Sequence, residues 1–133
     1  MIPGLENAEF TRCGVMHRNT FLDSPKVLQS DYSLRSNPNL FFAGQITGVE
    51  GYMESASSGI MAGLNAVRRM KGQSTVTLPQ TTMIGSLSRY VASGGEADFQ
   101  PMGANFGIMP ALESPVRDKK ERYAAFSARA LKD

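Results

Sequence analysis

The chain has 133 residues, a net charge of +2, 41% hydrophobic residues and 20% charged residues. These values are typical of a globular domain and exclude a chain that is basic throughout, as many nucleic-acid-binding domains are. The one cysteine cannot form an internal disulfide, no Cys/His cluster has zinc spacing, and no apolar run approaches the roughly 18–20 residues of a membrane span. We therefore expect a cytoplasmic protein without a metal site, a membrane segment or a secretory leader.

The first third of the chain is predicted to contain short extended segments separated by loops. Residues 15–22 have a mixed pattern that is read as extended, and Asp23-Ser24-Pro25 ends this segment. Residues 26–31 are read as a second short strand, and residues 33–39 as a polar loop. Residues 40–43 form a short, wholly apolar run, which is typical of a strand buried on both faces.

Helix signals follow in the rest of the chain. A helix is predicted from Glu50 or Gly51 to about Met70, with cations near its end. Its apolar positions recur at helical spacing: Met53, Ala56, Ile60, Gly63, Leu64 and Val67. Residues 73–79 are read as a linker, 81–92 as a shorter helix, 96–115 as loop and 117–131 as a last helix. We divide the chain into residues 1–72, which carry a strand–turn–helix unit, and 73–133, a helical and loop extension packed on it.

Three glycines, Gly44, Gly48 and Gly51, lie between the predicted strand at 40–43 and the long helix. Glycine allows positive φ and lets a ligand approach the backbone closely. The N-terminus of a helix adds free N–H groups and a partial positive charge. Together these features suit a phosphate or the electron-rich edge of a flavin, although a turn that only needs flexibility has the same glycines. The small residues at the start of the helix fit a bound flat ring or tight helix–sheet packing equally well.

Longer motifs give this turn a family context. Residues 40–56, LFFAGQITGVEGYMESA, closely resemble the FAD-closing motif of the flavoproteins that modify tRNA uridines. In the branch that adds carboxymethylaminomethyl groups to the wobble uridine, the turn usually reads N-G-T-T-G-Y-E-E-A. The sequence TGVEGYMES at 47–55 is instead similar to the branch of folate- and FAD-dependent tRNA (uracil-5-)-methyltransferases. The stretches GVMHRNTFLDSP at 14–25 and FQPMGANFGIMP at 99–110 resemble the same branch, with Gly103 where a polar residue is usual.

The resemblance implies an α/β fold, as a C-terminal fragment of a Rossmann-like FAD-binding domain with short strands, the strand–glycine turn–helix and two further helices. The glycine-rich fingerprint for the FAD pyrophosphate and the family's cysteine-bearing segments are absent. The parent enzyme would form 5-methyluridine in tRNA, with methylenetetrahydrofolate as carbon donor and reduced FAD, recharged by NAD(P)H, as reductant. The fragment alone would be inactive, because its partner, the amino-terminal part of the same enzyme, would be missing. We also expect it to self-associate through unpaired strand edges.

Site residues follow from the same resemblance. Gln45 would bond the ribityl chain of the flavin. The other cofactor-binding candidates are Gly44, Ile46, Gly48, Gly51 and Tyr52. His17, Arg18 and Asn19 are candidate folate or flavin contacts, although a lone histidine is more often structural. No catalytic residue is expected in the fragment, and Cys13 is read as incidental.

The last predicted helix carries a cluster of cations. They are Arg117, Lys119, Lys120 and Arg122. These side chains either form a solvated face or contact tRNA phosphates. Three other interpretations of the chain remain open: a fragment of the wobble-uridine flavoprotein, a tRNA- or protein-binding module without a cofactor, and a structural fragment with no function of its own.

Overall fold

The computed structural model describes residues 2–12, 14, 19–93 and 99–133. Its helices are α1 (Ser24–Val27), α2 (Tyr52–Met70), α3 (Met83–Ser93), α4 (Lys119–Lys132) and the short 3₁₀ helices η1 (Gly44–Thr47) and η2 (Phe106–Ile108). Its strands are β1 (Ser33–Leu34), β2 (Asn37–Phe41), β3 (Val49–Glu50) and β4 (Met102–Gly103). β1 pairs antiparallel with β2, and β3 pairs in parallel with β4. The predicted α/β class, with short strands and a strand–turn–helix, is confirmed.

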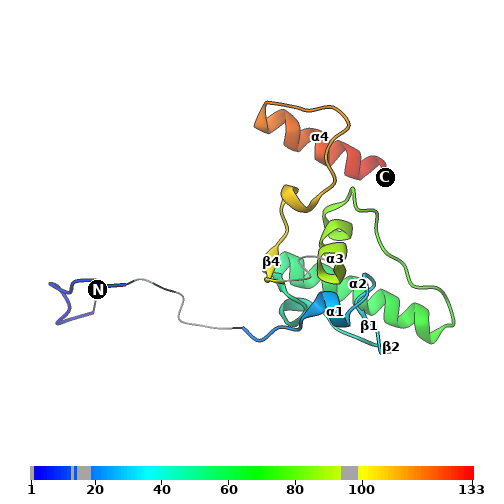
Figure 1. Cartoon of the computed structure of the whole chain (residues 1–133), viewed down its shortest axis with the longest axis horizontal. Helices are drawn as coiled ribbons and strands as arrows, with labels where there is room; N and C mark the ends of the chain where they lie inside the picture. The colour runs from blue at the N-terminus through cyan, green and yellow to red at the C-terminus, as the bar shows by residue number, and fades with distance from the viewer. Residues whose placement is uncertain (1, 13, 15–18, 94–98) are drawn as a thin grey trace.

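The hydrophobic core lies where α1, α3 and the turn before α2 meet. Leu28, Tyr32, Val49, Leu87 and Val91 are each 0–1% exposed, and burying a side chain of this size contributes about 1.5–3 kcal/mol. α1, α2, α3 and the β1–β2 pair form one body, whereas α4 lies apart from it (Figure 1). The core therefore supports the turn that precedes α2 and leaves the last helix outside.

A buried polar network joins the end of α2 to the turn before β1. The Ser33 N–H and hydroxyl donate to the Asp31 carboxylate at 3.0 and 2.6 Å, and the Arg69 guanidinium lies 3.9 Å from it. Burial raises the pKa of Asp31, but hydrogen bonds from Ser33 and Thr75 and the charge of Arg69 outweigh it, so that the pKa lies below its usual value. Asp31 is therefore ionised at neutral pH and serves as an acceptor for several donors.

The predicted α2 helix is confirmed, and the apolar positions that recur at helical spacing along it do not form its buried face. Ile60 is 71% exposed, and Leu64 and Val67 are 45% and 49% exposed. The buried residues are instead Ser58, Met61, Ala62 and Asn65. α2 packs its buried side against β2, η1, β3 and α3, whereas Ile60, Leu64 and Val67 keep 45–71% of their surface exposed.

The short segments before the turn also differ from the prediction. Residues 26–31 do not form a strand, because Pro25 occupies the first turn of α1, where its fixed φ favours a helix. The predicted loop at 33–39 contains β1 and the start of β2. The run at 40–43 is not buried on both faces: Leu40 is 45% exposed, and Phe41, Phe42 and Ala43 are only half-buried.

Other predictions fall partly outside the described residues. Residues 15–18 are not described, and residues 19–22 form no strand. The segment 96–115, predicted as loop, contains β4 and η2, while residues 96–98 are not described. The helices predicted at 81–92 and 117–131 are confirmed as α3 and α4 within two residues at each end.

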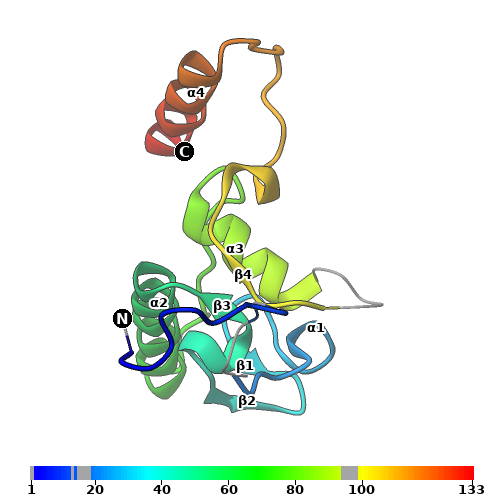
Figure 2. The same cartoon turned by 90° about the vertical axis from the view of Figure 1, so that its left-hand side faces the viewer.

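α4 is attached to the rest of the chain mainly through aromatic rings. The Tyr123 ring stacks on Phe106 with centroids 4.4 Å apart, and Phe126 lies 5.4 Å from the same ring. Arg129 donates to the carbonyl oxygens of Pro110 and Ala111 at 2.7 and 2.8 Å. Figure 2 shows the long connection that leads from η2 to α4. The division at residues 72 and 73 stays a prediction.

Candidate functional site

The glycine turn between β2 and α2 has a backbone shape that requires glycine. Gly48 has φ 82° and Gly51 has φ 106°, a region that side chains disfavour. A Cβ atom on Gly48 would lie 2.5 Å from the Phe99 ring, and one on Gly51 would collide with the Glu54 carboxylate. The predicted positive φ is confirmed at both positions, and the close neighbours there are protein side chains.

Hydrogen bonds from several elements fix this turn. The Gly44 N–H donates to the Ser58 hydroxyl on α2 at 2.8 Å, and the Ser24 hydroxyl on α1 donates to the Thr47 carbonyl at 2.9 Å. The Leu22 N–H donates to the Ile46 carbonyl at 2.8 Å. These contacts hold the first half of the turn, Gly44–Thr47, because they tie it to α1, to α2 and to the segment at Leu22.

The start of α2 leaves hydrogen-bond donors open. The first helical bond runs from the Ser55 N–H to the Gly51 carbonyl at 3.0 Å. Within the described ranges, the N–H groups of Tyr52, Met53 and Glu54 have no acceptor. Such groups, together with the helix dipole, favour a negatively charged or electron-rich ligand.

A hollow of about 280 Å³ lies at this helix end, lined by Gln45, Gly51, Tyr52 and Ser55. The structure thus brings together three of the predicted cofactor-binding residues. The Tyr52 side chain is 97% exposed and Ile46 is 39% exposed. Gly48 is buried, and its N–H donates to the Gln45 carbonyl at 3.0 Å, so within this chain it shapes the turn.

Other predicted site residues lie away from this hollow. His17 and Arg18 fall outside the described residues, and Asn19 is exposed in an irregular segment. On α4, Lys119 and Arg122 lie 5.7 and 5.9 Å from the Tyr123 ring centroid. Arg117 and Lys120 are exposed, and Lys120 belongs to α4, which lies apart from α2 in Figure 1.

Sequence reasoning missed the residues that brace the turn. The Glu54 carboxylate, on the first turn of α2, accepts the Ala104 N–H at 3.0 Å. Phe99 is 7% exposed against Gly48. The stretch 99–110 carries a family resemblance, yet nothing local in it indicates that it meets a turn about fifty residues before it.

The described residues contain neither a cluster of metal ligands nor a helix able to span a membrane. None of their Asp, Glu, Cys or His side chains gather in a group of three or more that could hold a metal ion. No helix among them combines the length and apolar character needed to cross a membrane.

The α/β fold places a glycine turn and open N–H donors at a helix N-terminus, an arrangement that suits an anionic or electron-rich group. The family model described as "Glucose inhibited division protein A" matches residues 1–74, and the chain belongs to this family.

Curated relatives indicate which branch of this family the chain resembles. A protein of Streptococcus agalactiae serotype Ia, named methylenetetrahydrofolate–tRNA-(uracil-5-)-methyltransferase TrmFO, is 63% identical over 134 aligned residues. Proteins of the same name from Desulfitobacterium hafniense and Streptococcus thermophilus are each 61% identical. The alignments cover 98–100% of this chain but 30% of each relative. The predicted resemblance to the uracil-5-methyltransferase branch is confirmed, and the chain spans about 30% of the length of these relatives.

Proposed function

We propose that this chain is the part of an FAD-dependent tRNA methyltransferase that closes over the flavin. The whole protein would form 5-methyluridine in tRNA, with methylenetetrahydrofolate as carbon donor and NAD(P)H as the source of electrons. The observation that carries the proposal is the identity of 63% over the whole chain to a relative of that name. The glycine turn at 44–51, with its open donors, supports it independently.

The residues of the hollow fit a flavin. The pyrimidine edge of a flavin carries carbonyl oxygens and becomes negatively charged on reduction, so it suits the open N–H groups of Tyr52 and Met53 and the positive end of α2. The Gln45 side chain lines the same hollow and has an amide that can bond a ribityl hydroxyl. The backbone of Gly44, Ile46 and Gly51 would approach the ring closely. Bound FAD would supply the electrons that reduce the transferred carbon unit.

The partners follow from the proposed reaction. They are tRNA, the folate and the remainder of the same protein, and tRNA as substrate implies the cytoplasm. His17, Arg18 and Asn19 are proposed to contact the folate or the flavin. The cations of α4 and Arg117 are proposed to approach tRNA phosphates, since they are exposed or half-buried and their positive charge suits the backbone. The isolated chain is expected to have no methyltransferase activity.

A titration of the 133-residue chain with FAD, followed by quenching of flavin fluorescence, tests the site. We expect saturable quenching, and a Kd about tenfold weaker in Gln45→Ala, because one side-chain hydrogen bond to the ligand is lost. Gln73→Ala is the matched control, since Gln73 is exposed in the linker after α2 and should leave the Kd unchanged. Equal affinity in Gln45→Ala and the unchanged chain would contradict the proposed role of Gln45.

The isolated chain is also proposed to self-associate. The apolar side of α2 and the edge of β2 are uncovered within the described residues, and exposed patches of this kind favour association. Light scattering is expected to give a mass above the 14.4 kDa of one chain. Ile60→Glu should shift the mass toward 14.4 kDa, whereas Lys71→Glu should not. A single-chain mass at all concentrations would argue against this expectation.

A further inference from the structure

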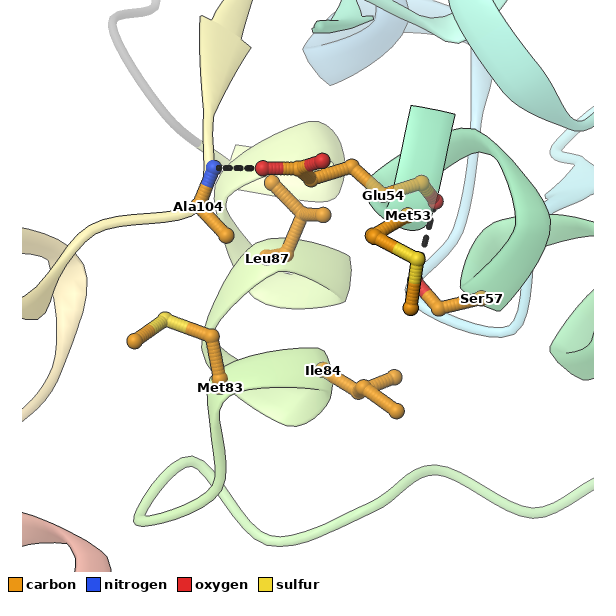
Figure 3. A pocket seen from close by; sticks show the side chains of 7 residues that line it. All are labelled: Met53, Glu54, Ser57, Met83, Ile84, Leu87 and Ala104. Carbon is orange, nitrogen blue, oxygen red and sulfur yellow. Dashed lines mark hydrogen bonds between the residues drawn. The ribbon is translucent and has the colours of Figure 1, made fainter. Parts of the chain in front are cut away.

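Residues 99–104 lie directly behind the glycine turn, and none of them lines the hollow. The Met102 N–H donates to the Gly48 carbonyl at 2.9 Å, and β4 continues this contact by pairing with β3. The Ala104 N–H donates to the Glu54 carboxylate at 3.0 Å, as Figure 3 shows. The segment therefore contacts the turn at its last glycines and at the first turn of α2.

The Phe99 ring fills the space that a side chain on Gly48 would need. A Cβ atom there would lie 2.5 Å from two atoms of the ring. The ring is 7% exposed and contacts Phe21 and Tyr90 with centroids 6.2 and 5.5 Å away. Phe21 precedes Leu22, whose N–H binds the Ile46 carbonyl. One buried ring thus connects Gly48 with α3 and with the segment that holds the other end of the turn.

The pairing of β3 with β4 alone is a weak restraint on the second half of the turn, Gly48–Gly51. β3 and β4 are each two residues long, and isolated short pairs of strands are at best marginal in water. Glycines at positive φ also lose more conformational freedom on folding than other residues. A packed aromatic side chain behind the turn restricts this freedom before any ligand arrives, and such preorganisation increases affinity.

We propose that Phe99 is a positioning residue for the FAD site. It does not touch the cofactor but holds Gly48–Gly51 in the shape that points the N–H groups of Tyr52 and Met53 toward the hollow. This inference rests on the proposed FAD site. By this inference, residues 99–104 stabilise the site through contacts with the glycine turn, without lining the hollow.

Amide hydrogen exchange in the 133-residue chain tests the positioning role without the cofactor. Phe99→Ala is expected to accelerate exchange of the Gly48 and Met102 amides about tenfold. Phe99→Leu, which keeps a large apolar side chain, should restore protection to within about threefold. Phe106→Ala is the matched control, because that ring packs on α4 and should leave both amides unchanged. The Leu28 amide, bonded to the Ser24 carbonyl at 2.8 Å, reports on the whole fold.

Two results of the exchange experiment would overturn the inference. Unchanged exchange at Gly48 would show that the ring does not hold the turn. Equal acceleration at Leu28 would show that Phe99 supports the fold in general. If Phe99→Ala does not fold, Phe99→Val is measured against Phe99→Leu with the same criteria.

FAD titration of the same variants connects the turn with the cofactor. Phe99→Ala is expected to weaken FAD binding about tenfold and Phe99→Leu by less than about threefold. Loss of protection at Gly48 without weaker FAD binding would overturn the positioning role. Absence of FAD binding in the unchanged chain would count against the proposed function, whereas the exchange data would still decide whether Phe99 holds the turn.

Discussion

Replacing Gly48 by alanine is expected to destabilise the chain by about 2–5 kcal/mol. A residue with a Cβ atom in the left-handed region costs about 1–2 kcal/mol. The collision of the new methyl group with its neighbours costs about a further 1–3 kcal/mol. Gly48 has φ 82°, and its Cβ would lie 2.5 Å from the Phe99 ring. Urea unfolding followed by circular dichroism measures the change in the free energy of unfolding.

Gly63→Ala is the matched control for this substitution. Gly63 lies inside α2 and is exposed, and a Cβ atom added to it would meet nothing within 4 Å. Alanine should therefore stabilise the helix by about 0.5–1 kcal/mol. The double variant Gly48→Ala/Phe99→Ala removes the collision in the alanine background and separates the two costs. A Gly48→Ala chain as stable as the unchanged one would contradict the structure of the turn.

Replacing Asn65 by alanine is expected to cost about 2–4 kcal/mol, although the new residue is the better helix former. Asn65 is fully buried on α2. Its amide donates to the Val76 carbonyl at 2.9 Å and accepts the Val76 N–H at 2.8 Å. It also donates to the Asp31 carbonyl at 3.3 Å. Alanine leaves these backbone groups without partners, and an unsatisfied buried group costs about 1–3 kcal/mol.

The neighbouring residue supplies the control. Leu64 is 45% exposed, so Leu64→Ala should cost less than about 1 kcal/mol. Asn65→Ala is thus expected to lower the free energy of unfolding more than Leu64→Ala. For most helices, replacing the apolar residue is the more costly change. If thermal and urea unfolding show Leu64→Ala to be the more damaging change, the buried face assigned to α2 is wrong.

Local signals in the sequence were sufficient to predict the positions of the turn and of three helices. Glycines between an apolar run and a helical pattern predicted the position of the turn, and α2 begins within two residues of the predicted start. The resemblance at 40–56 led to the family that the comparisons show. These features depend on neighbours along the chain, and a single sequence contains that information.

The buried side of α2 and the support of the glycine turn could not be predicted, because they depend on contacts between residues that are distant in the sequence. The apolar positions Ile60, Leu64 and Val67 recur at helical spacing, but which side of a helix is buried depends on what packs against it. Asn65 is buried because the Val76 backbone passes over it. The support of Gly48 by Phe99 joins residues that no periodic pattern relates.

The distance along the chain between the turn and its support has a consequence for synthesis. Glu54 and Ala104 are fifty residues apart, and ribosomes add about 5–20 residues per second. Roughly 3–10 seconds therefore pass between the appearance of the first helical turn and the arrival of the segment behind it. During this interval the turn and the start of α2 lack their contacts with β4 and Ala104. If the turn binds FAD as proposed, cofactor capture on the nascent chain would be delayed until β4 has emerged.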